Sequence, residues 1–592
     1  MNVNKRIIIL LIISIIICNV GLAAAFSSEP KPKVESQPQE IKKVKPEPSL
    51  EQDKVVVKSP DAQVKVEFSI AQDQPQYKVT YQDAELLDYS KLGFEFKNQP
   101  ALGSNLNLID ISRQEFNNTW QPVWGEEAEV KNHYQQLTLY LQEKKSPHRK
   151  LNLVFRVYND GVGFRYVLPE QPNLQQLEIM NEQTEFNLSS NNQSWWIPND
   201  WNSYEYSYLE TKVSEIPTVS TPFTMKTPQG IHLSIHEAAL VDYAGMALKH
   251  TDKTSLQSHL APWPDGSKVK GTAPLKTPWR TIQIGNDAGD LVESNLIMNL
   301  NEPNKIENTD WIEPVKYVGI WWEMHIGLSS WGSGPKHGAT TKNAKEYIDF
   351  ASQYLNTEEQ NIALLVEGWN RGWDGNWMKN GDKFDFTKPY PDYDLEEVVA
   401  YANQHNVEYM MHNETAGDIK NYEKQMDAAY DYYQNLGINA IKSGYVADYG
   451  IHNPAGHNHH GQYMVNHYLK AVKKAAEHEI MINTHEPIKG TGLYRTYPNW
   501  ISREGVKGME YNAWSGGNPP AHTTILPFTR MLSGPIDYTP GIFDVEISSR
   551  PNNRVKTTRA KQLALYVTIT SGSQMVADLP QNYKDSTGQI LP

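Results

Sequence analysis

Cysteine is almost absent from this 592-residue chain, and its scarcity excludes several kinds of chemistry. The single cysteine, Cys18, lies in an apolar stretch near the N-terminus. The remainder of the chain therefore has no disulfide and no thiol nucleophile. The sequence also lacks a zinc-ligand spacing, a Gly-rich phosphate loop and a Gly-x-Ser-x-Gly elbow. These absences argue against a zinc enzyme, a P-loop nucleotide enzyme and an α/β-type serine hydrolase.

Positive charge is also scarce: the formal net charge is −14 at pH 7, and no Lys/Arg-rich block occurs in the part expected to fold. Such a chain repels nucleic acid and anionic membrane surfaces, so neither is expected as a partner. Aromatic residues are plentiful, with 16 Trp and 32 Tyr. Exposed aromatic faces suit the stacking of sugar rings, and a neutral substrate fits this balance better than an anionic one.

The N-terminus predicts export from the cytoplasm. An apolar stretch from Ile7 to Leu22 follows two basic residues and precedes the small residues Ala23–Ala25. This arrangement is typical of a signal peptide, here residues 1–25. We expect a periplasmic protein without a transmembrane segment after signal removal. Lipidation at Cys18 is the alternative, which the bulky Ile17 before it disfavours.

Two changes of composition divide the mature chain. Residues 26–53 are rich in Pro, Lys, Glu, Gln and Ser, which predicts a disordered linker. Residues 54–304 consist of short segments of alternating polarity separated by turn residues, which predicts a large all-β sandwich. Clear examples of this alternation are Gln63–Ser69, Leu137–Leu141 and Leu151–Val157.

Residues 305–592 follow a different pattern, in which apolar runs alternate with amphipathic helical stretches. This pattern predicts a parallel sheet buried on both faces, and the number of units favours a closed (β/α)8 barrel. The expected strands are 317–322, 362–366, 409–411, 440–441 and 480–482, and the expected helices are 343–355, 395–405, 419–436 and 462–478.

Glutamates close three of the apolar runs in this half. The runs are Val407–Glu414, Ile480–Glu486 and Val506–Glu510, and Glu504 lies between the last two. In such a barrel the strand ends converge on one face, so these carboxylates can meet around one substrate. Cleavage of a glycosidic bond needs one carboxylic acid and one carboxylate. Ordinary salt bridges at the rim are the alternative for each residue.

Further polar residues stand near the expected strand ends. Glu205, in the β domain, would by itself be a solvated surface acid. Together with Glu504 and Glu510 it would form a cluster of carboxylates, which suits calcium because this ion prefers oxygen ligands. His412 and His485 could bind sugar hydroxyls or tune an acid, although a structural histidine is also a reasonable interpretation. Asp448 is another acid near a strand end, and a simple loop residue is its alternative.

Many segments in the same order resemble glycoside hydrolase family 97, in particular its α-glucosidase branch from Bacteroides starch utilisation. The resemblance runs from about residue 55 to the end of the chain. The segments that carry it are Gln121-Pro-Val-Trp-Gly-Glu-Glu, Glu237-Ala-Ala-Leu-Val-Asp-Tyr, Tyr317-Val-Gly-Ile-Trp-Trp, Leu365-Val-Glu-Gly-Trp-Asn, Met410-Met-His-Asn-Glu-Thr, Lys442-Ser-Gly-Tyr-Val, Asn483-Thr-His-Glu and His522-Thr-Thr-Ile-Leu-Pro-Phe-Thr-Arg.

The resemblance implies a calcium-dependent, exo-acting enzyme with an N-terminal β-super-sandwich and a catalytic (β/α)8 barrel. It also implies a small C-terminal β domain, which we expect to be absent or truncated here. Glu510 matches the general acid, and Glu486 and Glu414 match the carboxylates that activate water. The calcium ligands would be Glu205, Glu486, Glu504 and Glu510. The sugar contacts predicted for the site are Glu367, His412, Lys442 and His485.

The family contains retaining and inverting enzymes. Retaining members resemble this chain but carry an aspartate nucleophile at the end of the fourth barrel strand, where this chain has Lys442-Ser443-Gly444. We therefore expect an inverting α-glucosidase that acts on α-glucan oligosaccharides. The alternatives are a retaining α-galactosidase or another exo-α-glycosidase, and a non-catalytic sugar-binding protein. No feature of the sequence specifies an oligomeric state.

Overall fold

Strict polar–apolar alternation produces antiparallel sheets in the N-terminal half of the protein. In Gln74–Tyr81, every second side chain is buried, as expected for a strand with one face on a core. The computed structural model describes residues 42–43, 54–357, 362–447, 450–486, 488–585 and 587–591. The predicted signal peptide, residues 1–25, lies outside the described residues.

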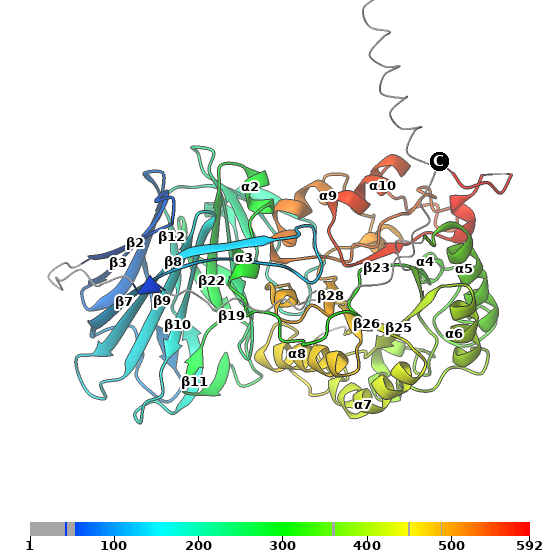
Figure 1. Cartoon of the computed structure of the whole chain (residues 1–592), viewed down its shortest axis with the longest axis horizontal. Helices are drawn as coiled ribbons and strands as arrows, with labels where there is room; N and C mark the ends of the chain where they lie inside the picture. The colour runs from blue at the N-terminus through cyan, green and yellow to red at the C-terminus, as the bar shows by residue number, and fades with distance from the viewer. Residues whose placement is uncertain are drawn as a thin grey trace, which may run out of the picture. The chain divides into compact units, whose positions relative to one another are not determined.

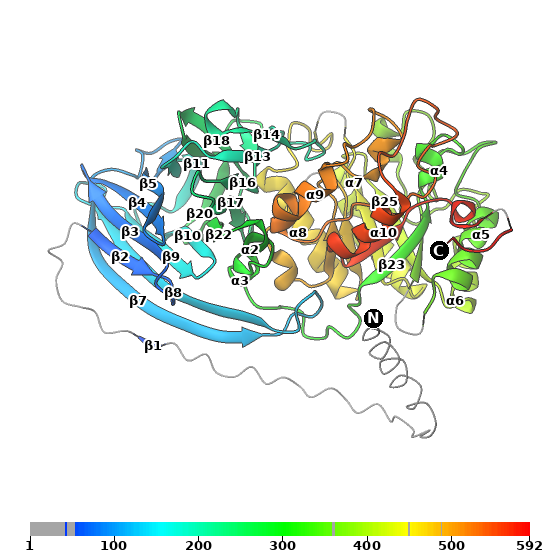
Figure 2. The same ribbon diagram turned by 90° about the horizontal axis from the view of Figure 1, so that it is seen from above.

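The N-terminal half is built from two large antiparallel sheets and one small one (Figures 1 and 2). The first, in spatial order, contains β1 (Lys42–Lys43), β7 (Leu106–Trp120), β8 (Val130–Glu143), β9 (Lys150–Tyr158), β10 (Gly161–Leu168), β22 (Trp279–Gly285), β17 (His232–Ala238), β16 (Phe223–Lys226), β13 (Gln193–Trp196) and β14 (Leu209–Lys212), with β21 (Leu275–Lys276) beside β10. The second contains β15 (Val219–Ser220), β18 (Met246–Asp252), β19 (Ser255–Leu260), β12 (Glu185–Leu188), β5 (Ala84–Lys91), β4 (Gln74–Tyr81), β3 (Val64–Ala71) and β2 (Lys54–Lys58). The small sheet contains β20 (Val269–Thr272), β11 (Gln176–Glu182) and β6 (Phe94–Phe96), and the short helices of this half are η1 (Val213–Glu215), α2 (Ala288–Val292) and α3 (Leu296–Asn299).

The two large sheets pack face to face through aromatic side chains. Tyr77 of β4 lies with its ring centroid 4.8 Å from that of Phe164 on β10 and 6.1 Å from that of Phe155 on β9. All three rings are buried in one continuous core. Such interdigitation between two inner faces is the packing of a β-sandwich, and the predicted sandwich is confirmed.

Part of the predicted linker is paired with the sandwich rather than free. Lys42–Lys43 form the short strand β1, which pairs antiparallel with Glu115 and Gln114 of β7. β7 lies at the edge of the sheet, and β1 pairs with two of its residues there. The division between the two halves at residues 304 and 305 stays a prediction.

The C-terminal half contains seven parallel strands among the described residues, with helices outside them (Figures 1 and 2). The strands are β23 (Val315–Ile320), β24 (Ile362–Val366), β25 (Glu408–Glu414), β26 (Ala440–Gly444), β27 (Met481–Thr484), β28 (Trp500–Arg503) and β29 (Ser573–Val576). The helices are α4 (Trp322–His325), α5 (Thr341–Tyr354), α6 (Leu395–Gln404), α7 (Ile419–Asn435), α8 (Gln462–Glu477), α9 (His522–Ile525) and α10 (Arg559–Thr568). The 3₁₀ turns are η2 (Trp377–Lys379), η3 (Gly381–Lys383), η4 (Leu493–Arg495), η5 (Met509–Asn512), η6 (Leu526–Phe528), η7 (Arg530–Ser533) and η8 (Pro580–Tyr583).

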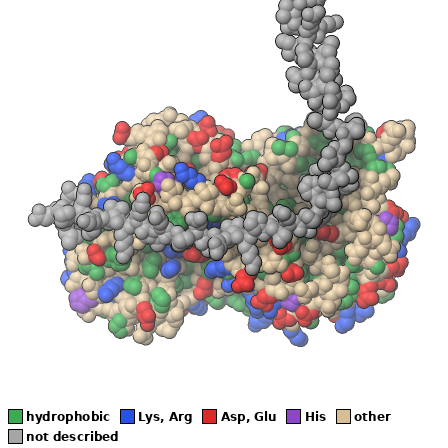
Figure 3. All heavy atoms as spheres, viewed as in Figure 1, with side chains coloured by type: hydrophobic (Ala, Val, Ile, Leu, Met, Phe, Trp, Pro, Cys, Tyr) green, Lys and Arg blue, Asp and Glu red, His purple; other side chains and the backbone are tan. Residues whose placement is uncertain are grey.

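Local sequence signals explain these helices and strands. All five side chains of β24 are buried, because the strand is covered on both faces. The side chains of Thr340, Asp394 and Asp418 accept hydrogen bonds from the first turns of α5, α6 and α7 and so fix where these helices begin. Acidic and basic side chains are mixed over the helical part of the face seen in Figure 3. None of the described helices is both long and apolar enough to cross a membrane.

An irregular segment completes the barrel between β28 and β29. The amide of Asp537 donates to the carbonyl of Arg503 at the end of β28 (2.8 Å), and the amide of Ile536 donates to the carbonyl of Thr570 near β29 (3.0 Å). Residues 536–538 therefore occupy the place of an eighth strand without forming regular ladders. The predicted barrel is confirmed in this nearly closed form.

One predicted strand end is wrong. The run Val506–Glu510 does not form a strand, and the strand in this region is β28, which ends at Arg503. Gly505 follows with a φ of +52°, a left-handed conformation that turns the chain out of the strand direction. Glu504 therefore directly follows a strand, whereas Glu510 lies in the 3₁₀ turn η5. β29 is the last strand among the described residues.

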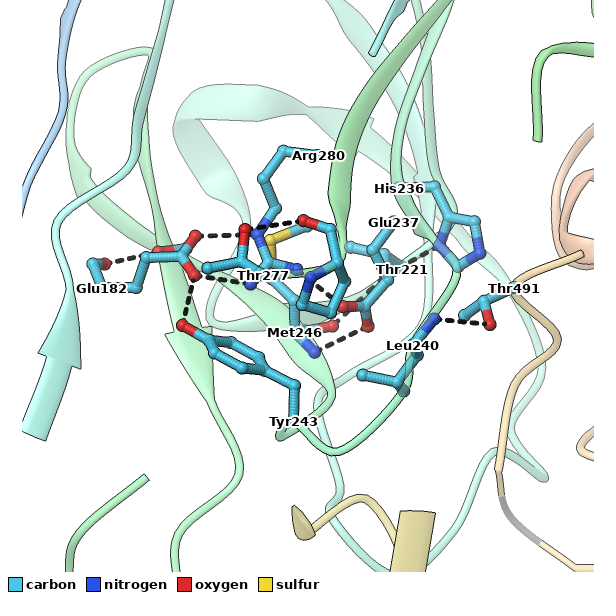
Figure 4. Close-up of polar contacts among 12 residues, drawn as sticks. Glu182, Thr221, His236, Glu237, Leu240, Tyr243, Met246, Thr277, Arg280 and Thr491 are labelled. Atoms are coloured by element: carbon cyan, nitrogen blue, oxygen red, sulfur yellow. Dashed lines mark hydrogen bonds and ion pairs between the residues drawn. The ribbon is translucent and has the colours of Figure 1, made fainter. Parts of the chain in front are cut away.

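A buried network of charges joins the sandwich to the barrel (Figure 4). Arg280 of β22 forms ion pairs with Glu182 (2.6 Å) and Glu237 (2.7 Å), and Glu237 also pairs with Lys489 of the barrel (2.8 Å). The side chains of all four residues are essentially inaccessible. Tyr243 donates a further hydrogen bond to Glu182 (2.9 Å). The two positive and two negative charges balance, which makes their joint burial tolerable.

Replacing one member of this network should destabilise the protein strongly. In Glu237→Gln, Lys489 loses its counter-charge in a site that water does not reach, so the free energy of unfolding should fall by about 3–5 kcal/mol. Glu397→Gln is the control, because Glu397 pairs with Lys345 at the surface and its loss should cost less than about 1 kcal/mol. Urea unfolding followed by circular dichroism measures both. Equal effects of the two substitutions would contradict the role of the network.

Candidate active site

The predicted site residues gather at the carboxyl ends of the barrel strands, as expected for a parallel barrel. Glu367 follows β24, and the loop after β27 carries His485 and Glu486. The remaining predicted barrel residues lie as follows: His412 and Glu414 at the end of β25, Lys442 in β26, Glu504 directly after β28 and Glu510 in η5.

Glu367, Lys442 and His412 form a buried group at the floor of the site. Lys442 Nζ lies 2.9 Å and His412 Nε2 lies 3.4 Å from the same oxygen, Glu367 Oε1, while the indole N–H of Trp331 donates to the other oxygen (2.8 Å). Burial opposes ionisation of Glu367, but the Lys442 charge, together with the neighbouring imidazoles and the Trp331 N–H, outweighs it and holds the pKa of Glu367 well below its usual range. Burial lowers the pKa of His412 to about 4, so this imidazole is neutral.

His485 lies between two carboxylates. Its Nδ1 is 3.2 Å from Glu504 Oε2, and its Nε2 is 2.9 Å from Asp537 Oδ2. Burial and the charge of Lys442 disfavour protonation, but the two acids outweigh them and raise the pKa of His485. The imidazolium in turn overcomes the effect of burial on Glu504 and lowers the pKa of that glutamate. His485 and Glu504 therefore form a charged pair.

Asp537 was not identified from the sequence, although it is central to this arrangement. Its Oδ2 accepts hydrogen bonds from Tyr317 Oη (2.6 Å) and Asn483 Nδ2 (2.6 Å) as well as from His485. The residue lies in the irregular segment 536–538, where no periodic pattern indicates a strand. Asp537 could have been found from the sequence in one way: it directly follows Ile536, in a region where an eight-stranded barrel needs one more strand.

Glu414 and Glu486 are held by backbone amides of the loops after β25 and β26. Val446 N (3.0 Å) and Ala416 N (2.7 Å) donate to Glu414 Oε1, and Tyr445 N donates to Glu486 Oε2. Glu486 itself adopts a φ of +59°, an uncommon backbone conformation for a residue with a side chain. Burial is the main reason that the pKa of Glu414 rises to about 8, and burial together with the Glu414 charge raises the pKa of Glu486 well above its usual value.

A side chain at residue 444, on the next strand, would collide with the carboxylate of Glu414 in its present position. A Cβ atom added to Gly444 would lie 2.1 Å from Glu414 Oε2, far inside van der Waals contact. Gly444 pairs directly with Glu414 in the ladder between β25 and β26. The carboxylate of Glu414 therefore occupies the space that a side chain at position 444 would need.

Three carboxylates converge where the sandwich meets the barrel. Oxygen atoms of Glu205, Glu504 and Glu510 all lie within 4.8 Å of one another. Glu205 comes from the sandwich and accepts a hydrogen bond from Tyr511 Oη (2.6 Å). Burial and the neighbouring Glu504 charge raise the pKa of Glu205 to about 8 and that of Glu510 well above its usual value.

A hard divalent cation fits this cluster, since three acidic oxygens repel one another until a cation neutralises them. The side chains of Glu205 and Glu510 remain partly exposed, so a bound ion could also keep water or ligand oxygens. Glu486 does not belong to the three whose oxygens lie together, but its backbone amide donates to Glu504 Oε2 (2.9 Å). The predicted ligand set is thus brought into one region.

Aromatic rings line the side of the site next to Glu510. His325, from α4, lies 3.8 Å from Glu510 Oε2 and is surrounded by indole rings, among them those of Trp321, Trp331 and Trp514. His325 was not predicted as a site residue, because it follows the apolar run that was assigned to a strand. Asp448, the further candidate acid, lies outside the described residues.

A separate cavity of about 140 Å³ lies at another part of the contact between sandwich and barrel. Its walls include Trp124, Glu127, Ile297, Tyr494 and Met531, and none of the predicted site residues lines it. The residues that were predicted at the strand ends therefore lie outside this cavity, around the carboxylate cluster. There, acids with raised pKa values can give up protons while their neighbours accept them.

Comparisons with known proteins agree with this arrangement. The family model described as Glycosyl-hydrolase 97 N-terminal matches residues 57–303, and that described as Glycoside hydrolase 97 matches residues 321–506. A Glycoside Hydrolase Family 97 enzyme from Pseudoalteromonas sp. strain K8, solved in complex with acarbose, is 46% identical with a TM-score of 0.86, covering 89% of this chain and 81% of that one. A variant of the same enzyme was solved with panose and has the same similarity values. A protein from Bacteroides thetaiotaomicron named retaining alpha-galactosidase is 26% identical over an alignment of 570 positions, which covers 89% of this chain and 79% of that protein.

The charge state of His485 should depend on Asp537. In Asp537→Asn the imidazole keeps Glu504 but loses its other anionic partner, so the pKa of His485 should fall. Titration of ¹³C-labelled histidines by NMR measures this shift. The resonances of His405, which lies at the end of α6, serve as the control. An unchanged His485 titration in the folded variant would show that Asp537 does not set its protonation.

Proposed function

The chain belongs to glycoside hydrolase family 97, and from this membership we propose that it is an exo-acting, calcium-dependent α-glucosidase that inverts configuration. Its substrates would be starch-derived α-glucan oligosaccharides, cleaved from the non-reducing end. The signal-peptide pattern of residues 1–25 supports a periplasmic location.

The close fit between Glu414 and Gly444 carries the inverting part of the proposal. A retaining glycosidase needs a carboxylate that attacks the sugar carbon. Ser443 and Gly444 at the end of β26 offer none, and Glu414 fills the adjacent space. Glu414 is held through Oε1 by two backbone amides. A carboxylate held in this position can accept a hydrogen bond from the water molecule that attacks the sugar in an inverting enzyme.

The preference for glucose rests on the more similar relatives. The Pseudoalteromonas enzyme, at 46% identity, was solved with acarbose and, as a variant, with panose. Panose is a trisaccharide of α-linked glucose. The relative named as an α-galactosidase is 26% identical and is also named as retaining. The absence of a carboxylate at residues 442–444 distinguishes this chain from the retaining pattern.

The mechanism follows from the protonation states of the cluster. Burial and the negative charges of Glu504 and Glu205 keep the proton on Glu510, which can then donate it to the glycosidic oxygen. Glu486, assisted by Glu414, accepts a proton from water on the opposite face of the sugar as the new C–O bond forms. This role needs an ionised Glu486, whereas burial and the Glu414 charge raise its pKa; the positive charge of calcium held at Glu486 would lower that pKa again. Glu510 thus ends deprotonated and Glu486 protonated, and exchange with solvent restores both.

The remaining polar residues would hold the sugar. Lys442, with its charge fixed by Glu367, presents N–H donors, and neutral His412 can donate or accept a hydrogen bond. Calcium would be held by Glu205, Glu504 and Glu510 together with the predicted fourth ligand, Glu486. When bound, the ion would supply positive charge that orders these carboxylates and lowers their pKa values.

Two other functions remain as alternatives. A retaining α-galactosidase is favoured by the name of the Bacteroides relative. A non-catalytic sugar-binding protein would retain the aromatic and polar residues but release no sugar. Both alternatives predict results different from those of the inverting glucosidase in the experiment below.

The anomeric form of the first product should be β-glucose. We would incubate the mature protein with calcium and maltotriose and follow the anomeric protons by NMR before mutarotation. Because the water attacks the face opposite the leaving group, the α-linkage yields the β-anomer. α-Glucose would indicate retention, release from α-galactosides alone would support the galactosidase, and no release from either by folded protein would support a binding protein.

Calcium should stabilise the folded protein through Glu205. At a free concentration of about 100 times its Kd, a ligand that binds only the folded state adds about 2.7 kcal/mol. We expect EDTA to lower the melting temperature of the wild type and to leave that of Glu205→Gln nearly unchanged. Glu210→Gln, an exposed glutamate of the neighbouring strand β14, should respond as the wild type does. A full calcium response in Glu205→Gln would contradict the site.

A further inference from the structure

His325 is a buried histidine without any hydrogen-bond partner. Its side chain is 9% exposed, and neither ring nitrogen has a partner among the described residues. Burial lowers the pKa of His325 to about 3, so the ring is neutral and has one N–H donor and one acceptor nitrogen. Leaving such groups unpaired costs free energy, and buried polar atoms in native proteins are nearly always paired.

His232, His412, His460 and His522 each have one buried ring nitrogen without a partner among the described residues, whereas His325 has two. Two further buried histidines have partners on both nitrogens. In His236, Nδ1 lies 3.1 Å from Thr221 Oγ1 and Nε2 lies 3.0 Å from the carbonyl oxygen of Gly490. In His467, Nδ1 lies 2.8 Å from Glu423 and Nε2 lies 3.1 Å from Tyr445 Oη. His325 therefore differs from structural histidines of comparable burial. Its unpaired nitrogens point to a partner outside the folded chain.

The surroundings of His325 resemble a sugar-binding surface. The imidazole lies 4.7 Å from the ring of Trp321, 5.0 Å from that of Trp331 and 4.9 Å from that of Trp514, measured between ring centroids. Trp321 is buried, whereas Trp514 is 36% exposed. The aromatic wall thus extends from the interior of the barrel to solvent, with an unpaired polar ring in its middle. Stacking on the indoles and a hydrogen bond to the imidazole together suit a sugar ring.

The position of His325 indicates which of the two sugars at the cleaved bond it would contact. Its Nε2 lies 3.8 Å from Glu510 Oε2, too far for a hydrogen bond but adjacent to the proposed acid. Glu510 would protonate the oxygen that joins the two sugars at the cleaved bond. In an exo-acting enzyme the sugar that departs with this oxygen would lie on the solvent side, and Trp514 is the exposed member of the wall. A buried donor, Arg550 Nε, also lacks an acceptor, and the Arg550 guanidinium packs near Gly327, two residues beyond His325.

We propose that His325 binds a hydroxyl group of the departing sugar, through a hydrogen bond made inside the wall of Trp321, Trp331 and Trp514. The residue would thereby select glycosides whose leaving group is itself a sugar. This inference rests on the proposed function in one respect, the assignment of Glu510 as the acid on the leaving-group side. His325 acts here as a substrate-binding residue and takes no proton in the reaction.

The test compares two substrates that differ only in the leaving group. Maltose has a departing glucose, whereas 4-nitrophenyl α-glucoside has an aromatic ring without sugar hydroxyls. His325→Phe keeps an aromatic ring in the wall but removes both nitrogens. We expect kcat/KM for maltose to fall about 10- to 100-fold, as for an unpaired buried polar group, and that for the nitrophenyl glucoside to fall less than about 3-fold. His325→Gln, which restores a donor and an acceptor, should recover part of the loss on maltose.

A binding measurement separates His325 from turnover. Calorimetry with acarbose, which spans several sugar rings, should show about 10- to 100-fold weaker binding to His325→Phe, while 1-deoxynojirimycin, a single ring, should bind as to the wild type. His405→Phe, at the end of α6, is the control and should change neither ligand. His325→Ala replaces His325→Phe if the latter does not fold, as judged by circular dichroism.

Each outcome bears on the proposal. Equal losses on maltose and the nitrophenyl glucoside, or no loss on maltose, would overturn the role of His325. If the wild type cleaves only α-galactosides, the proposed glucosidase fails, yet melibiose and 4-nitrophenyl α-galactoside test His325 in the same way. If it cleaves neither, the calorimetric comparison still decides, since weaker acarbose binding supports the contact and unchanged binding refutes it.

Discussion

The ion pair between Glu237 of the sandwich and Lys489 of the barrel is the contact on which the site most depends. It is buried, and it continues through Arg280 to Glu182 (Figure 4). Neither charge can be left alone in such surroundings, so the two halves of the protein must meet in one register. Lys489 also donates to Thr221 Oγ1 (2.6 Å), and the carbonyl of Gly490 lies 3.0 Å from His236 Nε2. The loop that follows β27 is thereby fixed to the sandwich along several residues.

The same loop carries His485 and Glu486, four and three residues before Lys489. The left-handed backbone conformation of Glu486 is uncommon for a glutamate and persists only when its neighbours determine it. The contacts of Lys489 and Gly490 with the sandwich hold the backbone after Glu486 in place. The hydrogen bond from the Glu486 amide to Glu504 holds the residue itself. The sandwich thus contributes more than Glu205 to the site. It holds the loop on which the proposed base lies.

Alternating charges explain how so many acids can lie together. Lys442 neutralises Glu367, and the imidazolium of His485 lies between Glu504 and Asp537. These pairs keep Glu367, Glu504 and Asp537 ionised in spite of burial. Glu510, by contrast, has no cation within hydrogen-bonding distance among the described residues and keeps its proton at higher pH. One fold therefore sets neighbouring carboxyls to opposite protonation states: Glu367, Glu504 and Asp537 are ionised, while the proposed acid, Glu510, keeps its proton.

Much of this arrangement could be predicted from local patterns, and the failures have physical causes. The expected strand 362–366 agrees with β24 at both ends, because a strand buried on both faces is a continuous apolar run between polar residues. Asp537 was missed because its segment completes the barrel through long-range hydrogen bonds without any alternation of its own. Val506–Glu510 was wrongly taken as a strand because an apolar run of five residues does not distinguish a strand from a buried turn. Burial of His325 without a partner is a three-dimensional property that no spacing reveals.

The fit between Glu414 and Gly444 is the structural feature on which the proposed inversion depends. A Cβ at residue 444 would lie 2.1 Å from Glu414 Oε2, so a nucleophile there requires that the carboxylate at 414 leave its present place. Glu414 is held there by the amides of Ala416 and Val446, and Val446 belongs to the loop that directly follows Gly444. A change at 444 would therefore disturb the loop that holds Glu414. Moving the carboxylate from strand β25 to strand β26 therefore involves a shift of the end of the Glu414 side chain, and of the hydrogen bonds that hold it, in addition to the substitution at 444.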